Sequence, residues 1–263
     1  MNGDVAAQVG WAHVLLNGYG TARDPDAAFR WFRLAARSGN ADAINMIGRC
    51  HELGWGTAQN IRLAEQAYCL AVKKGHAWGC FNLAMLMLAR GETDQRRREI
   101  LSLLVRAARR GITPAISFIG QACEEGWCGL PRPGTARRWY ARAARRGCYR
   151  GKFNLARQNM SEGDVDGAIR WLERAVKAGP PNFNIELGAY LAAHPDQRLR
   201  EIAALALEQA ELHPPRSEQW SAMGQASVVP SERTTAPSIL EGRRNNICRV
   251  LRKLTGVVRL SRM

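Results

Sequence analysis

Two stretches of the chain share one pattern: residues 24–40 read DPDAAFRWFRLAARSGN, and residues 132–147 read RPGTARRWYARAARRG. Each opens with a polar residue and a proline, which is typical of a helix N-cap and first turn. Alanine and aromatic residues then recur at the i, i+3, i+4 and i+7 spacing of one helix face. The first stretch carries this stripe at Ala28, Trp31, Phe32, Ala35 and Ala36. The pattern predicts an amphipathic helix, and we expect the tryptophans of its stripe to be buried; these are Trp31, Trp139 and Trp171.

The glycine that ends this phrase returns at a fixed interval. It stands at Gly39, Gly75, Gly111, Gly147 and Gly179, which are 36, 36, 36 and 32 residues apart. Such a period indicates a solenoid, because one unit of this size cannot bury its apolar face alone. The predicted units cover residues 4–39, 40–75, 76–111, 112–147 and 148–179, and a degraded unit covers 180–212.

Each unit also predicts a helix before the aromatic one. In the second unit, small and apolar residues four apart, such as Ala43 and Ile47, lead to a turn at Gly54-Trp55-Gly56. Glycine ends helices because it adopts positive φ without steric strain. One position of this first helix carries only small residues, which would let the two helices of a unit approach closely; examples are Gly48, Ala84, Gly120 and Ala156.

The full phrase, A-x-x-x-L-G, then G-x-G, then D-x-x-x-A-x-x-W-Y-x-x-A-A-x-x-G, resembles the Sel-1-like repeat, a relative of the tetratricopeptide repeat. The resemblance covers residues 4–179 well and 180–212 weakly. It implies an all-α, right-handed α-solenoid superhelix of about six helix-turn-helix units. It also implies a non-enzymatic scaffold or adaptor that binds a protein or peptide through its concave face. The third unit lacks the G-x-G turn and the fifth is four residues shorter, so we expect local changes of curvature there.

Two surfaces of such a solenoid are candidates for the partner site. Equal positions in stacked units share an orientation, so the tenth residues predict one wall of the concave face: Arg49, Met85, Gln121 and Arg157. Met85 and Leu88 would place an apolar spot at the centre of this wall, and exposed apolar spots mark interaction sites. If the phase is off by one residue, both belong to the core instead.

The second candidate surface is an edge of aromatic rings. Tyr19, Trp55 and Trp127 hold the same place in the turns between paired helices. Stacking would bring them to one edge, as a platform for a proline-rich or sugar-bearing ligand. Alternatively, each ring folds over the next unit and seals the core.

Composition and motifs exclude several classes of function. Seven cysteines form no CxxC pair and have no histidine at ligand spacing, so no metal or cofactor is expected. The five histidines belong to no catalytic motif, which predicts a protein that is not an enzyme. An enzyme stays an alternative, since relatives occasionally hydrolyse substrates without an obvious motif. No stretch is apolar enough to span a bilayer and no export signal is visible, so we expect a cytoplasmic protein unless an upstream signal is lost from the sequence.

The formal charge is +15, and part of the excess lies near the C-terminus. Residues 213–238 are rich in Pro, Ser, Thr and Gln and predict a linker. Residues 239–263 predict a basic amphipathic helix, with an apolar stripe at Ile247, Val250, Leu251, Leu254, Val257 and Val258. This helix could cap the last unit of the solenoid, which we favour. The alternative function is a peripheral membrane or polyanion-associated factor that uses this helix; a nucleic-acid partner is not expected.

Overall fold

The computed structural model describes residues 4–90, 93–127 and 129–212. These described residues form twelve α-helices and no strand, which confirms the all-α prediction. The helices are α1 (Val5–Asn17), α2 (Pro25–Arg37), α3 (Ala41–Leu53), α4 (Ile61–Lys73), α5 (Ala77–Ala89), α6 (Asp94–Arg109), α7 (Thr113–Glu124), α8 (Pro133–Arg145), α9 (Tyr149–Ser161), α10 (Val165–Ala178), α11 (Pro181–Leu191) and α12 (Gln197–Leu212).

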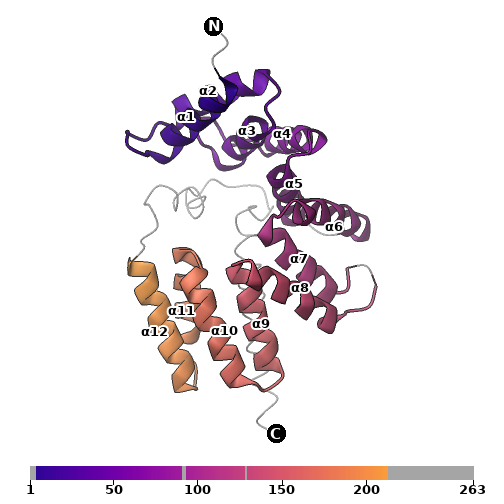
Figure 1. The fold of residues 1–263 in the computed structure, drawn as a ribbon, viewed down its shortest axis with the longest axis vertical. Helices are drawn as coiled ribbons and strands as arrows, with labels where there is room; N and C mark the ends of the chain where they lie inside the picture. The colour runs from indigo at the N-terminus through magenta and orange to yellow at the C-terminus, as the bar shows by residue number, and fades with distance from the viewer. Residues whose placement is uncertain (1–3, 91–92, 128, 213–263) are drawn as a thin grey trace, which may run out of the picture.

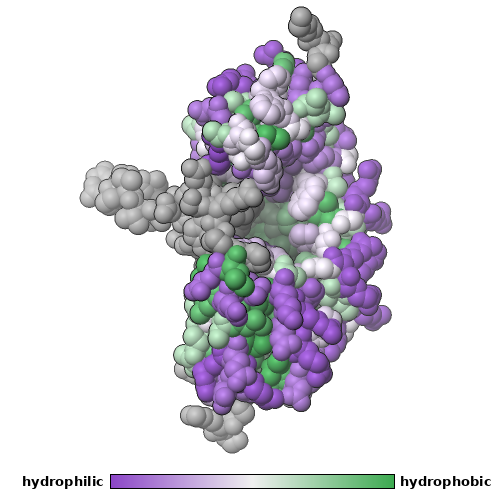
Figure 2. All heavy atoms as spheres, turned by 60° about the vertical axis from the view of Figure 1, so that its left-hand side comes forward, coloured by the Kyte–Doolittle hydropathy of each residue, from purple (hydrophilic) through white to green (hydrophobic). Residues whose placement is uncertain are grey.

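The helices stack in pairs into a curved solenoid (Figure 1), and its surface is hollowed on the concave side (Figure 2). Each predicted unit range contains one pair, from α1 and α2 in residues 4–39 to α11 and α12 in residues 180–212. In the middle of the stack, α3, α5 and α7 lie nearer to the hollow than their partners α4, α6 and α8 (Figure 1). The first helices therefore form the inner wall and the second helices the outer one.

Local sequence explains where the second helices begin. The Asp24 side chain accepts a hydrogen bond from the Ala27 backbone N–H at 2.8 Å, and Asn60 accepts one from Leu63 at 3.1 Å. These bonds satisfy N–H groups that the first helical turn leaves without partners. Between units, Gly39 has φ of +78° and the chain turns there into the next first helix. A side chain would be strained in this conformation.

One position of the second helix lies at the centre of each unit. Phe32, Tyr68, Leu104, Tyr140 and Leu172 occupy it and are all buried. The predicted tryptophans lie one residue before it, and the prediction that they are buried is wrong: Trp31, Trp139 and Trp171 are only half-buried. Successive residues of a helix are turned by 100°, so only one of two neighbouring aromatics can face the middle of the unit. The tryptophans pack at its margin, where the Arg142 guanidinium lies 5.6 Å from the Trp139 ring centre.

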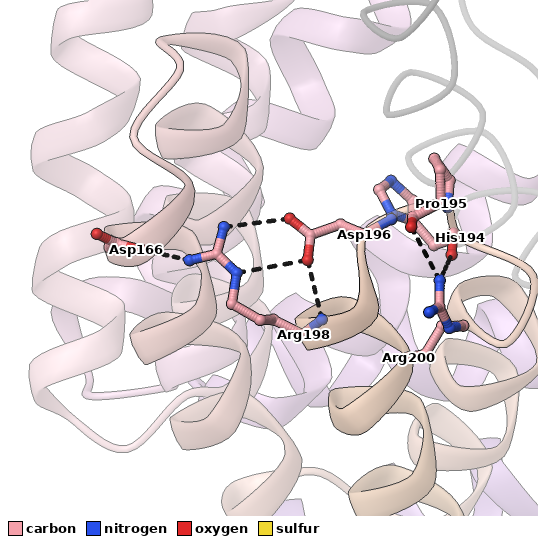
Figure 3. Close-up of polar contacts among 6 residues, drawn as sticks. All are labelled: Asp166, His194, Pro195, Asp196, Arg198 and Arg200. Atoms are coloured by element: carbon pink, nitrogen blue, oxygen red, sulfur yellow. Dashed lines mark hydrogen bonds and ion pairs between the residues drawn. The ribbon is translucent and has the colours of Figure 1, made fainter.

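The degraded sixth unit shares a hydrophobic core with the fifth, and a polar cluster lies beside this contact (Figure 3). The Arg198 guanidinium donates from Nη1 to Asp166 Oδ1 at 2.7 Å, from the start of α12 to the start of α10. Its Nη2 donates to Asp196 Oδ2 at 3.2 Å, and the Asp196 Oδ1 atom accepts the Arg198 backbone N–H at 2.9 Å. Exposed ion pairs of this kind contribute little stability each.

Two predictions fall outside the part of the chain that the structure describes. They are the linker over residues 213–238 and the basic amphipathic helix over 239–263. Among the described residues, no helix has both the length and the apolar character that crossing a bilayer requires. The same residues contain no group of three or more His, Cys, Asp or Glu side chains that could hold a metal ion.

Candidate functional site on the inner wall

We assign the third, seventh and tenth residues of each unit to the side of the first helix that faces the inner wall. These positions have i, i+4 and i+7 spacing, so they share one face of the first helix. On α5 they are Trp78, Asn82 and Met85, and on α9 they are Arg150, Asn154 and Arg157. Figure 2 looks into the hollow that this wall bounds, and apolar residues are visible on the wall beside the grey atoms.

Neighbouring first helices are joined by contacts that repeat along the wall. Asn82 Nδ2 donates to Asn45 Oδ1 at 2.9 Å, and Asn154 Nδ2 donates to Ser117 Oγ at 3.5 Å. Both bonds join the seventh residue of one unit to the sixth residue of the unit before. At the step between them, the Phe81 and Phe118 rings make the same connection, with centroids 6.0 Å apart. The wall thus alternates between amide or hydroxyl pairs and an aromatic pair, which holds its side chains in place.

The middle of the wall carries an exposed aromatic residue. Trp78 is 46 % exposed, and its ring meets the Phe81 ring edge-on at a centroid distance of 5.7 Å. The Arg150 guanidinium lies 5.7 Å from the Phe118 ring centre, on the side of the fifth unit. Trp78, Phe81, Phe118 and Arg150 are named here the central aromatic patch. Exposed tryptophan is common at binding sites because it offers a large rigid apolar area together with an N–H donor.

Sequence reasoning missed this patch, although a signal was present. Trp78 stands seven residues before Met85, and i, i+7 residues lie on the same helix face. The tenth residues of the units mark this helix face in the sequence, and the residue two helical turns before Met85 on the same face is Trp78.

A cluster of one carboxylate and two histidines lies nearer the N-terminal end of the wall. The Oδ2 atom of Asp42 lies 3.6 Å from His13 Nε2, and its Oδ1 atom lies 3.6 Å from His76 Nε2. One carboxylate therefore connects three units. The hydrogen bond from His13 holds the pKa of Asp42 below its usual value, against the opposing effect of burial. Burial lowers the pKa of His76, whose Nδ1 accepts the Gly79 backbone N–H at 3.1 Å and so caps α5.

The predicted wall residues fall into two groups. Arg49, Gln121 and Arg157 are half-buried. Each is engaged within the protein. The Arg49 guanidinium lies 5.0 Å from the centre of the Trp55 ring, Gln121 Nε2 donates to Glu125 Oε1 at 3.1 Å, and Arg157 pairs with Glu124.

The expectation of an apolar spot at Met85 and Leu88 is wrong. Met85 is 8 % exposed, and it belongs to the large core cluster around α5, α6 and α7, against which the half-buried Leu88 packs. An apolar side chain at this position gains by turning into the core, whereas the arginines at the same position find partners: Arg49 lies over the Trp55 ring and Arg157 pairs with Glu124. The exposed apolar residue of the wall is Trp78, two helical turns before Met85 on the same face of α5.

The three turn aromatics do not form one exposed edge. Tyr19 is exposed, Trp55 is half-buried beneath Arg49, and Trp127 is buried with its indole Nε1–H donating to Glu125 Oε2 at 2.9 Å. For Trp127 the alternative interpretation, a ring that seals the core, describes the geometry. Burial removes a large apolar ring from water while its N–H keeps an acceptor.

The fold and the inner wall define the class of this protein as an all-α repeat solenoid. The Sel1 repeat model matches residues 5–40, 41–76, 113–148 and 153–180, and the chain belongs to this family. Sel1 repeat proteins are generally protein-interaction scaffolds. The matched ranges omit the third unit, which lacks the G-x-G turn, and the degraded sixth unit.

Solved structures of the same architecture are similar to this chain. A Sel1 repeat protein from Oxalobacter formigenes is 25 % identical, with a TM-score of 0.65 over 79 % of this chain and 85 % of the other. A protective antigen of uropathogenic Escherichia coli with an SLR fold is 24 % identical, with a TM-score of 0.58 over 84 % of this chain and 48 % of the antigen. An immunity protein from Pseudomonas aeruginosa is 14 % identical, with a TM-score of 0.55 over 80 % and 83 % of the two chains. The last two likenesses concern the fold alone.

One curated relative is chitin synthase regulatory factor 3 of Schizosaccharomyces pombe. It is 28 % identical over 156 residues, which are 54 % of this chain and 16 % of the relative. This chain therefore spans about a sixth of the length of the relative that it matches.

Proposed function

We propose that this protein is a non-enzymatic scaffold that binds a segment of another protein along its inner wall, with an apolar side chain of the partner covering Trp78. The observation that carries the proposal is the exposure of Trp78, 46 %, in the middle of a wall whose other apolar residues, such as Met85 and Phe118, are buried. Leaving a tryptophan in water forgoes the stabilisation that burial of its ring provides. A partner side chain would recover it.

The surroundings of Trp78 support a protein segment as the ligand. Polar residues lie close in sequence to the members of the central aromatic patch: His76 and Asn82 in unit three and Asn154 in unit five. Amide groups can exchange hydrogen bonds with an extended peptide backbone, and an apolar centre with a polar rim is the usual anatomy of a protein interface.

A photo-crosslinking experiment tests this proposal. A photoreactive amino acid is placed at position 78, and in a matched control at position 70, because Leu70 on the outer helix α4 is also 46 % exposed. In cells that make the protein, we expect a discrete crosslinked partner from position 78 and none from position 70. A probe at position 121 should lose the same partner when Trp78→Ala is added. Equal crosslinking from both positions, or crosslinking from position 70 alone, would reject the inner wall as the site.

A second candidate function is association with a polyanion, and one described feature favours it. Exposed arginines recur 36 residues apart on the outer helices α6 and α8: Arg106, Arg109, Arg110, Arg142, Arg145 and Arg146. Such a field attracts anionic surfaces, and its effect falls as salt rises. Binding to heparin or to vesicles containing phosphatidylserine at low salt, abolished by Arg109→Glu with Arg145→Glu and insensitive to Trp78→Ala, would support this alternative.

A further inference from the structure

The last described helix pair ends in a face that has the residues of an internal contact, and no other unit among residues 4–212 packs on it. The central second-helix position is at most 5 % exposed in the first five units, where Leu172 is the most exposed. The sixth-unit residue at this position is Leu207, because it packs on Gly188 as Tyr68 packs on Gly48: a Cβ atom on Gly188 would lie 2.7 Å from Leu207 Cγ. Leu207 is 38 % exposed.

The first helix of the sixth unit shows the same difference. Ile185 occupies the sixth position of its unit and is exposed, whereas Asn45, Ser117 and Phe153 occupy it in earlier units and are buried. In those earlier units a following helix covers the position, as Asn82 covers Asn45 and Asn154 covers Ser117. Ile185 and Leu207 therefore lie where a further helix would pack.

Along α12, this face combines apolar and acidic residues. Ala204, Leu207, Glu208 and Glu211 have i, i+3, i+4 and i+7 spacing, share one side of the helix and are all exposed. With Ile185 they are named here the terminal face. In Figure 2, which brings the side of α12 forward, apolar residues run between hydrophilic ones through the lower half of the molecule.

We propose that residues 239–260 of the same chain dock on the terminal face and close the solenoid. The sequence of this segment has an apolar stripe that includes Val250, Leu251 and Leu254. Docking would bury this stripe together with the exposed side chains of Leu207 and Ile185. Arginine and lysine flank the stripe, at Arg249, Arg252 and Lys253, and would face Glu208 and Glu211. Opposite charges at the rim of an apolar contact favour this pairing and its register.

The chain has the length to make this contact. The structure describes α12 to Leu212, so the 26 residues 213–238 connect the terminal face to the docking segment. A random coil of 26 residues has an end-to-end distance of about 25 to 30 Å, similar to the length of α12. A tether of this kind presents its end at an effective concentration on the order of millimolar, so a weak contact suffices.

Charge disfavours a second copy of the chain on the same face. Two terminal faces packed together by a two-fold axis would bring Glu208 and Glu211 of one copy near the same acidic residues of the other. Like charges across an interface oppose association. An anionic membrane would accept the basic segment but would repel the terminal face, so Leu207 and Ile185 would stay exposed.

A crosslinking experiment on the full chain tests the proposal. Cys248 lies three residues before Leu251 and thus near the apolar stripe. The Ala204→Cys variant places a thiol on the terminal face, and the Leu70→Cys variant, on an exposed site of α4, is the matched control. Under mild oxidation, with peptides mapped by mass spectrometry, we expect an intramolecular disulfide to Cys248 at least tenfold faster from position 204 than from position 70. Adding Glu208→Arg and Glu211→Arg should abolish this difference, and Arg249→Glu with Arg252→Glu should restore it.

The other occupants give different outcomes. Equal rates from positions 204 and 70 would overturn the proposal. A disulfide found only between two chains would assign the terminal face to a second copy. Sedimentation with phosphatidylserine vesicles that depends on residues 239–263, together with equal crosslinking rates, would assign the segment to a membrane. The terminal face is separate from the inner wall, so none of these results bears on the proposed scaffold function.

Discussion

Units two and four connect their two helices by a buried carboxylate and a tyrosine, whereas units one and three use only apolar side chains at the same positions. In unit two, Tyr68 Oη donates to Glu52 Oε2 at 2.6 Å, and in unit four Tyr140 Oη donates to Glu124 Oε2 at 2.9 Å. Units one and three place Leu16 with Phe32 and Leu88 with Leu104 at these positions. All four second-helix residues are fully buried.

The facing small residue changes together with this pair. The units with tyrosine have Gly48 and Gly120, and the units with phenylalanine or leucine have Ala12 and Ala84. A Cβ atom on Gly48 would lie 2.6 Å from Tyr68 Cδ1, and one on Gly120 would lie 2.6 Å from Tyr140 Cε1. Stacking therefore requires a given volume between the two helices of a unit. Either two apolar side chains or a carboxylate with a tyrosine can fill it, provided that the polar atoms are hydrogen-bonded.

The two polar units also differ from each other. Glu124 is bonded to Arg157 and, at 3.4 Å, to Gln158 Nε2 of the next unit, so it joins units four and five. Burial alone would raise the pKa of Glu124, but the hydrogen bond and charge of Arg157 outweigh it and hold the pKa below its usual value. Burial and the Glu124 charge raise the pKa of Tyr140, which remains a hydrogen-bond donor.

The largest expected effect comes from removing one partner of the ion pair between Glu124 and Arg157. Glu124→Leu leaves the Arg157 guanidinium buried without its carboxylate, and such a change costs about 3 to 5 kcal/mol of unfolding free energy. Urea unfolding measures it. The control is Glu124→Leu combined with Arg157→Met, which removes both charges and should recover most of the loss. If the double variant is as unstable as the single one, the ion pair is not the cause.

An intermediate effect tests the link between glycine and tyrosine. Gly48→Ala forces a methyl group against the Tyr68 ring, and overpacking of this kind costs about 1 to 3 kcal/mol. Adding Glu52→Leu and Tyr68→Leu reproduces the set of unit three, Ala84, Leu88 and Leu104, and should restore stability. Thermal unfolding followed by circular dichroism is the measurement. A triple variant no more stable than Gly48→Ala would show that the sets cannot be exchanged between units.

The smallest effect is a difference in pH dependence. Because the folded-state pKa of Glu124 is below its ordinary value of 4.5, the stability that it contributes is present above pH 4.5 and is lost as pH falls through the folded-state pKa. The unfolding free energy of the wild type should therefore fall more steeply in acid than that of the Glu124→Leu, Arg157→Met variant. Parallel curves for the two proteins would show that Glu124 titrates alike in the folded and unfolded states.

The helix pairs and their stacking could be predicted from the sequence, because the interactions responsible are local and recur. An N-cap such as Asp24 acts on a backbone N–H three residues away, and the apolar stripe follows from helix geometry. The period of 36 residues then required each unit to pack on the next. Even the approach of paired helices at Gly48 and Gly120 could be predicted from residue size.

Which side chains remain at the surface could not be predicted from the sequence, because it depends on packing between units. Phe32 is buried and Trp31 half-buried, although both lie on the predicted stripe, and Met85 turns into the core while Trp78 remains exposed. Each choice depends on what the helices of the adjacent units place opposite the side chain, which lies tens of residues away in the chain. Packing across units has no local signal in the sequence, because it depends on the shape of both partners.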